Sequence, residues 1–409
     1  MSERAIPHEV LLVAACCRWP LSDAALAAIR TAASGPIDWP LFMRVVRRHR
    51  VVGLVHHALG LAHIDVPADI ALDLAKRAEN IARQAMRLAS ETLRLQRLFD
   101  AEGIPTVVLK GAAVAQLAYR TLGLKQALDI DLLILPDQAR DALRMLEKDG
   151  YRLHEPASAL DDAQWRVVMR FGSEVMVVDR ARGLAVELRW RAAENMLLFK
   201  GVDLFAHTLE VPLSGGSLRT FDDENQFAYL CVHGARHGWY RLKWLADLNA
   251  LLASKDDATI ERLFAHAQSI GSGLCAGLAL LLCNELLALK LPQALHSRLQ
   301  KDWRLRLAVR LALNLMIGSQ PDMEAKDRPR QLLAFSVTVL PFLLGSGSRY
   351  FIRQAWIISV SLEDVIKYPM PSWLYALYPI LRGPLWICRS VSSSKRDIKP
   401  ERDRANAGL

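Results

Sequence analysis

The stretch that decides the fold is ALDIDLLIL, at residues 127–135. It is apolar enough for a buried strand, yet Asp129 and Asp131 lie inside it. Side chains alternate between the two faces of a strand, so both carboxylates point to the same side. Two like charges side by side are costly unless something positive lies with them. We therefore expect a cation or a cationic side chain at this point of the strand.

The sequence around this stretch alternates between strand and helix patterns. The run at 106–111 is β-branched and ends in glycine, and the segment at 136–150 has proline at its start and glycine at its end. An RARG turn joins two further apolar runs and predicts a hairpin. In chain order we expect a strand at 106–111, a helix at 112–123, a strand at 128–135, a helix at 136–150 and strands at 173–179 and 184–190.

Helical periodicity dominates on both sides of this unit. The expected fold class is therefore α+β, with a small mixed-sheet core of strand, helix, strand, helix and strands flanked by N- and C-terminal helical regions. The tail is polar and charged, as in disordered segments. The predicted divisions are an N-terminal helical region at 1–103, the α/β core at 104–220, a C-terminal helical region at 221–389 and a disordered tail at 390–409.

The composition is that of a globular protein with a basic excess. The 409 residues suffice for two or three domains, and the formal net charge is +9. Such a charge favours anionic partners such as nucleotides, nucleic acid or a membrane surface, although basic residues also occur on any solvated surface. No specific nucleic-acid motif is present. The Trp- and Pro-rich region at 335–392 either packs onto the core or makes a weak contact with a membrane surface.

The apolar and cysteine-containing segments predict a cytoplasmic protein. The apolar run at 274–291 is interrupted by Asn284 and Glu285, so we expect a buried core helix there and not a membrane span. The short apolar run near the N-terminus is a poor match to a signal peptide. The six cysteines form no CxxC pair and have mostly apolar surroundings, which is typical of reduced core thiols.

Paired carboxylates on one face of a strand are a natural ligand set for a hard divalent cation. Mg²⁺ prefers carboxylate and phosphate oxygens, and two such ions can clamp the reacting oxygens of a nucleotidyl transfer. A DxD pair alone is a weak signal, but here apolar residues flank both acids. Glu187, in LAVELRW at 184–190, is a third acid within an apolar strand. It either completes a metal site with Asp129 and Asp131 or faces water on an edge strand.

A phosphate-binding element is expected just upstream. The strand VVLKG ends at Lys110 and Gly111, and Gly111 opens the following helix. Backbone N–H groups at a helix start attract phosphate, and glycine allows a close approach. Lys110 adds a positive charge beside them, and Lys125, four residues before Asp129, could act in the same way.

The sequence resembles the uncharacterised nucleotidyltransferase family of the polymerase-β-like nucleotidyltransferase superfamily. The similarity runs along most of the chain, from the segment at 38–51 to the segment at 377–386. The motifs that carry it are LKGAAVAQLAY at 109–119, GLKQALDIDLLIL at 123–135, VELRW at 186–190 and HGARHGWYRLKWLADLNALL at 233–252.

The resemblance implies roles for residues at the matching positions. In that superfamily a Gly-Ser turn holds the nucleotide phosphates, and DxD with a third acid binds two metals. Those roles fall here to Lys110–Gly111 and to Asp129, Asp131 and Glu187. The sequence departs from the pattern at three places: Lys-Gly replaces Gly-Ser, Lys125 stands where arginine is more usual, and Arg189 occupies a usual histidine position.

Two further residue pairs belong to the same motifs. His233 and His237 are spaced i, i+4, but no acid lies between them, so a zinc protease is disfavoured. They either line a nucleotide cleft or pack. Lys243 and Asp247 have the same spacing and either form a helix salt bridge or face the active site.

The leading hypothesis is therefore a metal-dependent nucleotidyltransferase that uses Mg²⁺ or Mn²⁺. It would move a nucleoside monophosphate from an NTP to an unknown acceptor, which is a small molecule, a peptide or a protein, and release pyrophosphate. The alternative is a non-catalytic protein of the same fold that binds a nucleotide or a partner. The residues expected to contact the nucleotide are Lys110, Gly111, Lys125, Arg189, His237, Lys243 and Asp247.

Overall fold

The computed structural model describes residues 6–156, 160–317, 339–360 and 362–367. The expected tail at 390–409 and most of the Trp- and Pro-rich region lie outside these residues. The part of that region which is described packs inward, because Leu340, Leu344 and Tyr350 are buried in the main hydrophobic core. The described residues contain no helix that is both long enough and apolar enough to cross a bilayer.

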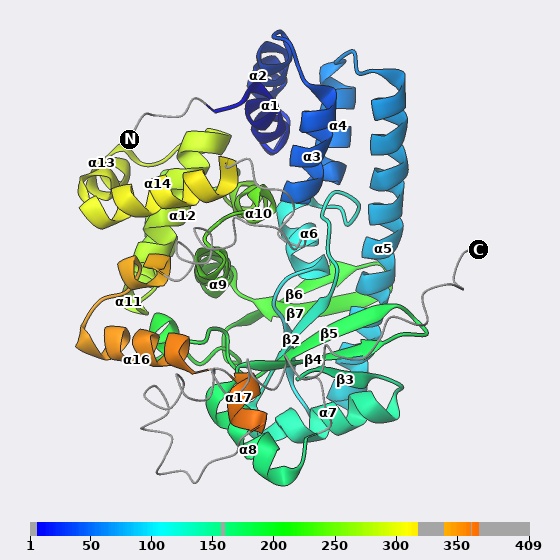
Figure 1. The fold of residues 1–409 in the computed structure, drawn as a ribbon, viewed down its shortest axis with the longest axis vertical. Helices are drawn as coiled ribbons and strands as arrows, with labels where there is room; N and C mark the ends of the chain where they lie inside the picture. Colours follow the sequence, from blue (N-terminus) through cyan, green and yellow to red (C-terminus); the bar gives the residue numbers. More distant parts are fainter. Residues whose placement is uncertain (1–5, 157–159, 318–338, 361, 368–409) are drawn as a thin grey trace, which may run out of the picture.

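The N-terminal region is helical, as predicted (Figure 1). Its last helix, α5, has 34 residues and runs along one side of the molecule with one apolar face on the core. It ends before Gly103, whose φ of 71° suits glycine because it lies in the left-handed region. The helices are α1 (His8–Cys16), α2 (Asp23–Ala33), α3 (Trp39–His49), α4 (Val52–Ala62) and α5 (Ala68–Ala101).

A mixed five-stranded sheet forms the α/β core, in the order β1-β2-β5-β4-β3. β2 and β5 pair in parallel, whereas every other neighbouring pair in this sheet is antiparallel. The predicted α+β class with a small mixed sheet is confirmed. The strands are β1 (Thr106–Val108), β2 (Ile130–Ile134), β3 (Arg152–Glu155), β4 (Glu174–Asp179) and β5 (Leu184–Arg189).

The predicted elements of the core form with small changes at their ends. The expected helix at 112–123 is α6 (Ala112–Tyr119), and the expected helix at 136–150 is a 3-10 turn followed by α7 (Ala139–Lys148). The hairpin predicted around RARG forms between β4 and β5. Four features were not predicted from the sequence: β3, α8 (Asp162–Phe171), the short 3-10 helix η2 (Met196–Phe199) and the hairpin of β6 (Thr208–Leu213) and β7 (Gly216–Phe221).

The C-terminal region returns to helices that pack beside the N-terminal ones (Figure 1). The segment at 274–291 gives α12, a buried core helix as predicted. The described helices are α9 (Asp223–Arg236), α10 (Leu242–Leu252), α11 (Asp257–Ser269), α12 (Gly273–Leu287), α13 (Gln293–Lys301), α14 (Trp303–Ile317), α16 (Ser348–Ser359) and α17 (Leu362–Lys367).

Two hydrophobic cores hold these layers together. The larger core joins the N-terminal helices α1–α4 to α9, α10 and α12, so both helical regions share buried side chains. The smaller core lies between the sheet, α5, α7 and α8. The division of the chain into the predicted domains stays a prediction.

The turn between α9 and α10 is held by a close aromatic contact. Trp239 is fully buried and has a left-handed φ of 54°. Its ring lies against Gly234 of α9, where an added Cβ would come within 2.3 Å of the ring. Only glycine leaves room for this ring, so the approach fixes how α10 leaves α9.

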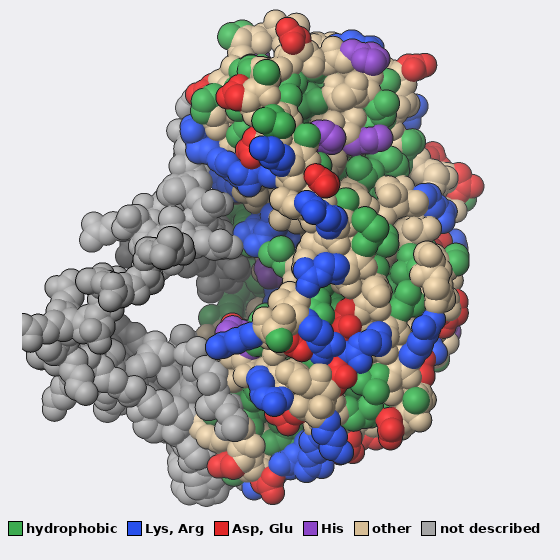
Figure 2. Space-filling model, turned by 90° about the vertical axis from the view of Figure 1, so that its right-hand side faces the viewer, with side chains coloured by type: hydrophobic (Ala, Val, Ile, Leu, Met, Phe, Trp, Pro, Cys, Tyr) green, Lys and Arg blue, Asp and Glu red, His purple; other side chains and the backbone are tan. Residues whose placement is uncertain are grey.

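Basic and acidic side chains are mixed on the face of the molecule shown in Figure 2. On the face shown in Figure 2, Lys and Arg are spread over the described surface with Asp and Glu between them. That distribution fits the solvated-surface interpretation for this face. The five described cysteines, Cys16, Cys17, Cys231, Cys275 and Cys283, are buried and free, as expected for core thiols.

Candidate active site

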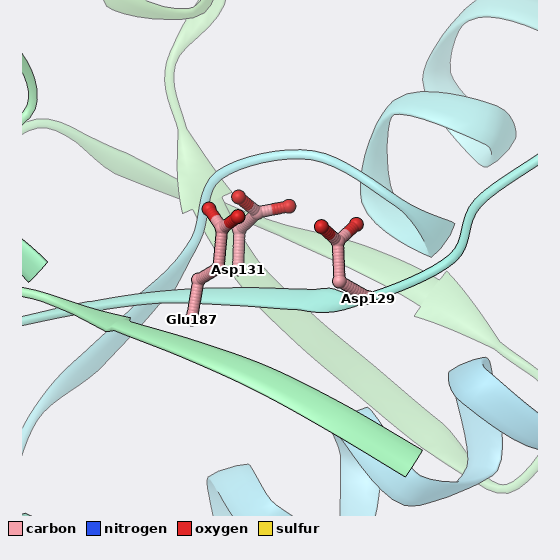
Figure 3. Close-up of side chains that lie close together, drawn as sticks. All are labelled: Asp129, Asp131 and Glu187. Carbon is pink, nitrogen blue, oxygen red and sulfur yellow. The ribbon is translucent and has the colours of Figure 1, made fainter. Parts of the chain in front are cut away.

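The three acids predicted from sequence lie together on neighbouring strands (Figure 3). Asp131 of β2 is the direct register partner of Glu187 in the parallel strand β5. Asp129 immediately precedes β2, and all three carboxylates point to the same side of the strands. One ligand atom from each residue lies within 4.8 Å of the others. The strand pairing therefore builds an all-oxygen pocket of the kind that hard divalent cations prefer.

The three carboxyl groups cannot all ionise easily without a cation. Burial raises the pKa of Glu187 to about 9, and the charge of Asp131 adds to the shift. Burial and the Asp131 charge also raise the pKa of Asp129. Burial opposes ionisation of Asp131 too, but Lys110 and a hydrogen bond from Glu187 hold the pKa of Asp131 below its ordinary value. A bound divalent ion would favour the ionised form of all three carboxyl groups.

The raised pKa of Glu187 means that its carboxyl group keeps a proton near neutral pH, and this predicts a pH-dependent affinity for metal. A cation must displace the proton from Glu187, whose folded-state pKa lies well above neutrality, so affinity should rise as the pH rises towards that value. We expect Mn²⁺ to bind roughly tenfold more tightly per pH unit between about pH 6.5 and 8.5, since one proton is released. Titration of Mn²⁺ by electron paramagnetic resonance measures it. Glu187→Gln should flatten the dependence, and a wild-type affinity independent of pH would contradict the assignment.

Two cationic side chains already touch the acids. Lys110 Nζ lies 2.7 Å from Asp131 Oδ1. Burial works against the Lys110 charge, but Asp131 raises its pKa above the ordinary lysine value. Arg189, which is 2% exposed, places Nη1 3.2 Å from Glu187 Oε2 and 4.0 Å from Asp131 Oδ1. Its Nη2 pairs with Glu174 at the start of β4.

The predicted phosphate element begins beside Lys110. Gly111 precedes α6 with φ of 62° and ψ of −126°, a backbone conformation that residues other than glycine rarely adopt. It lies three residues after the end of β1 and leads the chain into the first residues of α6. The N–H groups at the start of α6 therefore follow directly on the lysine that contacts Asp131.

Lys125 and Asp247 form a buried ion pair near this element. Lys125 Nζ binds Asp247 Oδ2, and the hydroxyl of Tyr119 donates to Asp247 Oδ1 at 3.0 Å. Asp247 is thus tied to the loop before β2 and to α6. Lys243, one turn earlier on α10, lies where burial and then the positive charges of Lys125 and Arg50 lower its pKa to about 7.

The histidines belong to a row of rings between α9 and α10. Tyr229 stacks on His233, His233 meets His237 edge-on, and His237 stacks on Trp244 with ring centroids 4.9 Å apart. His237 follows the last residue of α9 and caps it. Burial lowers the pKa of both histidines, to about 3 for His237, so both are neutral near pH 7.

A family model described as "Uncharacterised nucleotidyltransferase" matches residues 35–288. The chain belongs to this family. No curated protein and no solved structure matches the chain. The family match includes every site residue predicted from the sequence, and it ends at the last turn of α12. The predicted similarity up to residue 386 extends beyond that match, so α13 and the later helices lie outside it.

Three neighbours of the site were missed by sequence reasoning. Glu174 is the register partner of Arg189 across the β4–β5 hairpin, so counting outward from the RARG turn could have found it. Tyr229 is fully buried, and burial raises its pKa to about 12 despite the nearby charges of Lys110 and Arg189. Trp244 stands next to Lys243 and gave no separate signal, because a tryptophan at helical spacing also suits a core.

Proposed function

We propose that the protein is a metal-dependent nucleotidyltransferase that moves a nucleoside monophosphate from an NTP to an acceptor hydroxyl. The single observation that carries this proposal is the meeting of Asp129, Asp131 and Glu187 within 4.8 Å on a parallel strand pair. The family supports general nucleotidyl transfer and leaves the substrate and acceptor open. The acids would hold Mg²⁺ or Mn²⁺, and that cation would neutralise charge on the phosphates.

The side chains around the acids suit a triphosphate. The N-terminus of α6 lies beside Lys110, and the pKa of Lys243 is lowered first by burial and then by repulsion from nearby cations, which include Lys125 and Lys110. An anionic ligand among them would relieve that repulsion. The charge of these groups would also stabilise the negative charge that grows on the leaving pyrophosphate.

Glu187 is the group that we assign to proton transfer. Its carboxylate lies at the end of β5 next to Arg189, and burial makes it the most basic of the three acids. In its ionised form it would accept the proton of the attacking hydroxyl at one carboxylate oxygen. Arg189 would orient that carboxylate, because its Nη1 lies 3.2 Å from Glu187 Oε2.

The test is binding and turnover of NTPs by the full chain. We expect binding of at least one NTP in Mn²⁺ or Mg²⁺, its loss on chelation, and slow pyrophosphate release with water as acceptor. Lys243→Met should weaken NTP binding about tenfold, the scale of one desolvated charge contact. Lys301→Met, on the last turn of α13, is the matched control and should change nothing. Absence of metal-dependent NTP binding in the wild type would defeat the proposal.

The contact of Arg189 with Glu187 favours one second candidate, a non-catalytic nucleotide-binding protein. The guanidinium engages the third acid, and its other nitrogen is held by Glu174. Such a protein would bind NTP with metal and release no pyrophosphate with any acceptor. Pyrophosphate measurement over all four NTPs therefore separates the two candidates.

The cytoplasmic setting and the membrane-surface contact stay predictions.

A further inference from the structure

A cavity of about 400 Å³ shares Arg189 with the candidate active site. Its wall at the active-site end is Arg189, whose guanidinium lies 3.2 Å from Glu187 and 4.0 Å from Asp131. His233 and His237 also line the cavity, so it borders the row of rings between α9 and α10. The guanidinium of Arg189 therefore links the cavity to the carboxylates of the candidate active site.

The body of the cavity is apolar. Side chains from α9, α12 and α16 and from residues 341–344 close around it. Its volume is at the lower end of the range of about 300–1,000 Å³ typical of small-molecule pockets. The apolar lining residues are Ala192, Ala193, Leu198, Val232, Ala235, Cys275, Pro341, Leu344, Tyr350, Ile357 and Ile358.

The charges on the cavity wall are already compensated. Arg236 Nη2 lies 2.7 Å from Glu194 Oε1, and Arg189 is paired with Glu174 and Glu187. An amide pair completes the polar lining, since Asn195 Nδ2 donates to Gln354 Oε1 at 3.2 Å. The described cavity wall thus offers no unbalanced charge to a ligand, which disfavours a phosphorylated or carboxylated body.

One buried donor at the active-site end lacks a partner. Arg189 is 2% exposed, and its Nε atom has no hydrogen-bond partner among the described residues. Buried donors in native proteins are nearly always satisfied, so this orphan marks Arg189 as the polar end of a largely apolar cavity. The same guanidinium holds the carboxylate that we assign to proton transfer.

We propose that this cavity receives the acceptor, an uncharged small molecule with an apolar body and a hydroxyl group at the Arg189 end. The inference rests on the proposed function. In the transfer, the hydroxyl oxygen bonds to the α-phosphorus and the bond from that phosphorus to the α–β bridging oxygen breaks. Pyrophosphate leaves with the electron pair, and the hydroxyl proton passes to Glu187. The family match covers the cavity wall from Arg189 to Cys275, whereas the wall from Pro341 to Ile358 lies beyond it.

The test uses benzyl alcohol and glycerol, which share the hydroxyl and differ in the apolar body. With each NTP and Mn²⁺, we expect the wild type to form the benzyl nucleotide ester at least tenfold faster than the glycerol ester, measured by mass spectrometry. Ile357→Trp, which fills the cavity from α16, should cut benzyl transfer at least tenfold and leave NTP binding unchanged. Ile352→Trp, on the same helix with a 70% exposed side chain, is the matched control.

Equal or faster use of glycerol, faster labelling of a serine- or tyrosine-containing peptide, or an Ile357→Trp variant with unchanged benzyl transfer would overturn the inference. Ala235→Val fills the cavity from α9 and gives the same readout if Ile357→Trp does not fold. Binding of 4-fluorobenzyl alcohol, followed by fluorine NMR without NTP, separates the two proposals. If Ile357→Trp loses this binding and the control Ile352→Trp keeps it, the cavity assignment is supported. Unchanged binding in Ile357→Trp contradicts it. Failure of NTP binding in the wild type defeats the proposed function instead.

Discussion

The double variant Asp129→Asn, Asp131→Asn will lose metal-dependent pyrophosphate release by at least about 10³-fold, because metal-based charge stabilisation supplies several kcal/mol. The substitution keeps the side-chain volumes and removes two of the three carboxylates that meet beside β5. Glu187 alone cannot hold a divalent ion against water, so Mn²⁺ binding should be lost together with turnover. Both are measured on the same sample, by pyrophosphate release and by Mn²⁺ titration.

The single variant Asp129→Asn is measured as well, in case the double variant does not fold. It leaves the contact of Lys110 with Asp131 in place, so the buried lysine keeps its partner. The matched control is Asp137→Asn, an exposed aspartate just after the same strand, which should change neither quantity. Retention of metal binding by the folded double variant would remove the three acids from the proposed site.

Replacement of Arg189 should have the largest effect on stability. Arg189→Met is expected to lower the free energy of unfolding by about 3–5 kcal/mol, as when one partner of a buried ion pair is removed. The guanidinium is 2% exposed and lies among Glu174, Glu187 and Asp131. Without it, Asp131 keeps its contact with Lys110 and Glu174 keeps a 3.9 Å contact with Arg236, whereas Glu187 loses its cation. Urea unfolding at neutral pH without added metal measures it.

A second substitution tests the cause of that loss. Glu174→Met in the Arg189→Met background removes one of the carboxylates that have lost the guanidinium, and it should recover part of the stability. Arg180→Met, in the exposed turn between β4 and β5, should stay within about 0.5 kcal/mol of the wild type. If Arg189→Met also stayed within that range, the guanidinium would not be the group that balances these acids.

The acids could be predicted because their pattern is local. DxD within an apolar strand forces both carboxylates to one face, and Glu187 is recognisable as an acid in a second apolar strand. The sequence could not show that β2 and β5 pair in parallel with Asp131 opposite Glu187. Register between distant strands is set by packing over the whole sheet, and a slip of one residue would turn Glu187 to the other face.

The missed elements differ in the signal that they leave in the sequence. α8 buries Trp165, Val167 and Val168 behind an Asp161 capping box, so its pattern could have been recognised. β3 is the tetrapeptide RLHE, which has no fully buried residue, and its pairing with β4 is irregular. The β6–β7 hairpin has partly buried strands, but it includes Pro212, which argues against a strand when the sequence is considered alone. Periodicity records burial on one face, so an edge strand with little buried surface leaves almost no trace.

The same limit applies to the cationic neighbours. Lys243 and Asp247 suggested a helix salt bridge by spacing, yet Asp247 binds Lys125 from a loop far away in the sequence. Local spacing states which residues can touch on one helix, but not whether a distant lysine reaches the acid first. The cavity was invisible for a related reason, because its walls come from segments that span residues 189–358.

The parallel pairing of β2 with β5 also has a consequence for how the chain matures. Asp131 leaves the ribosome well before Glu187, and β3, α8 and β4 must be made before β5 can join β2. A nascent chain therefore holds only two of the acids, and pairing of such distant strands is intrinsically slow. A divalent ion that needs all three acids would bind the finished sheet and not its precursors. Its binding would therefore stabilise the folded state relative to the incomplete ones.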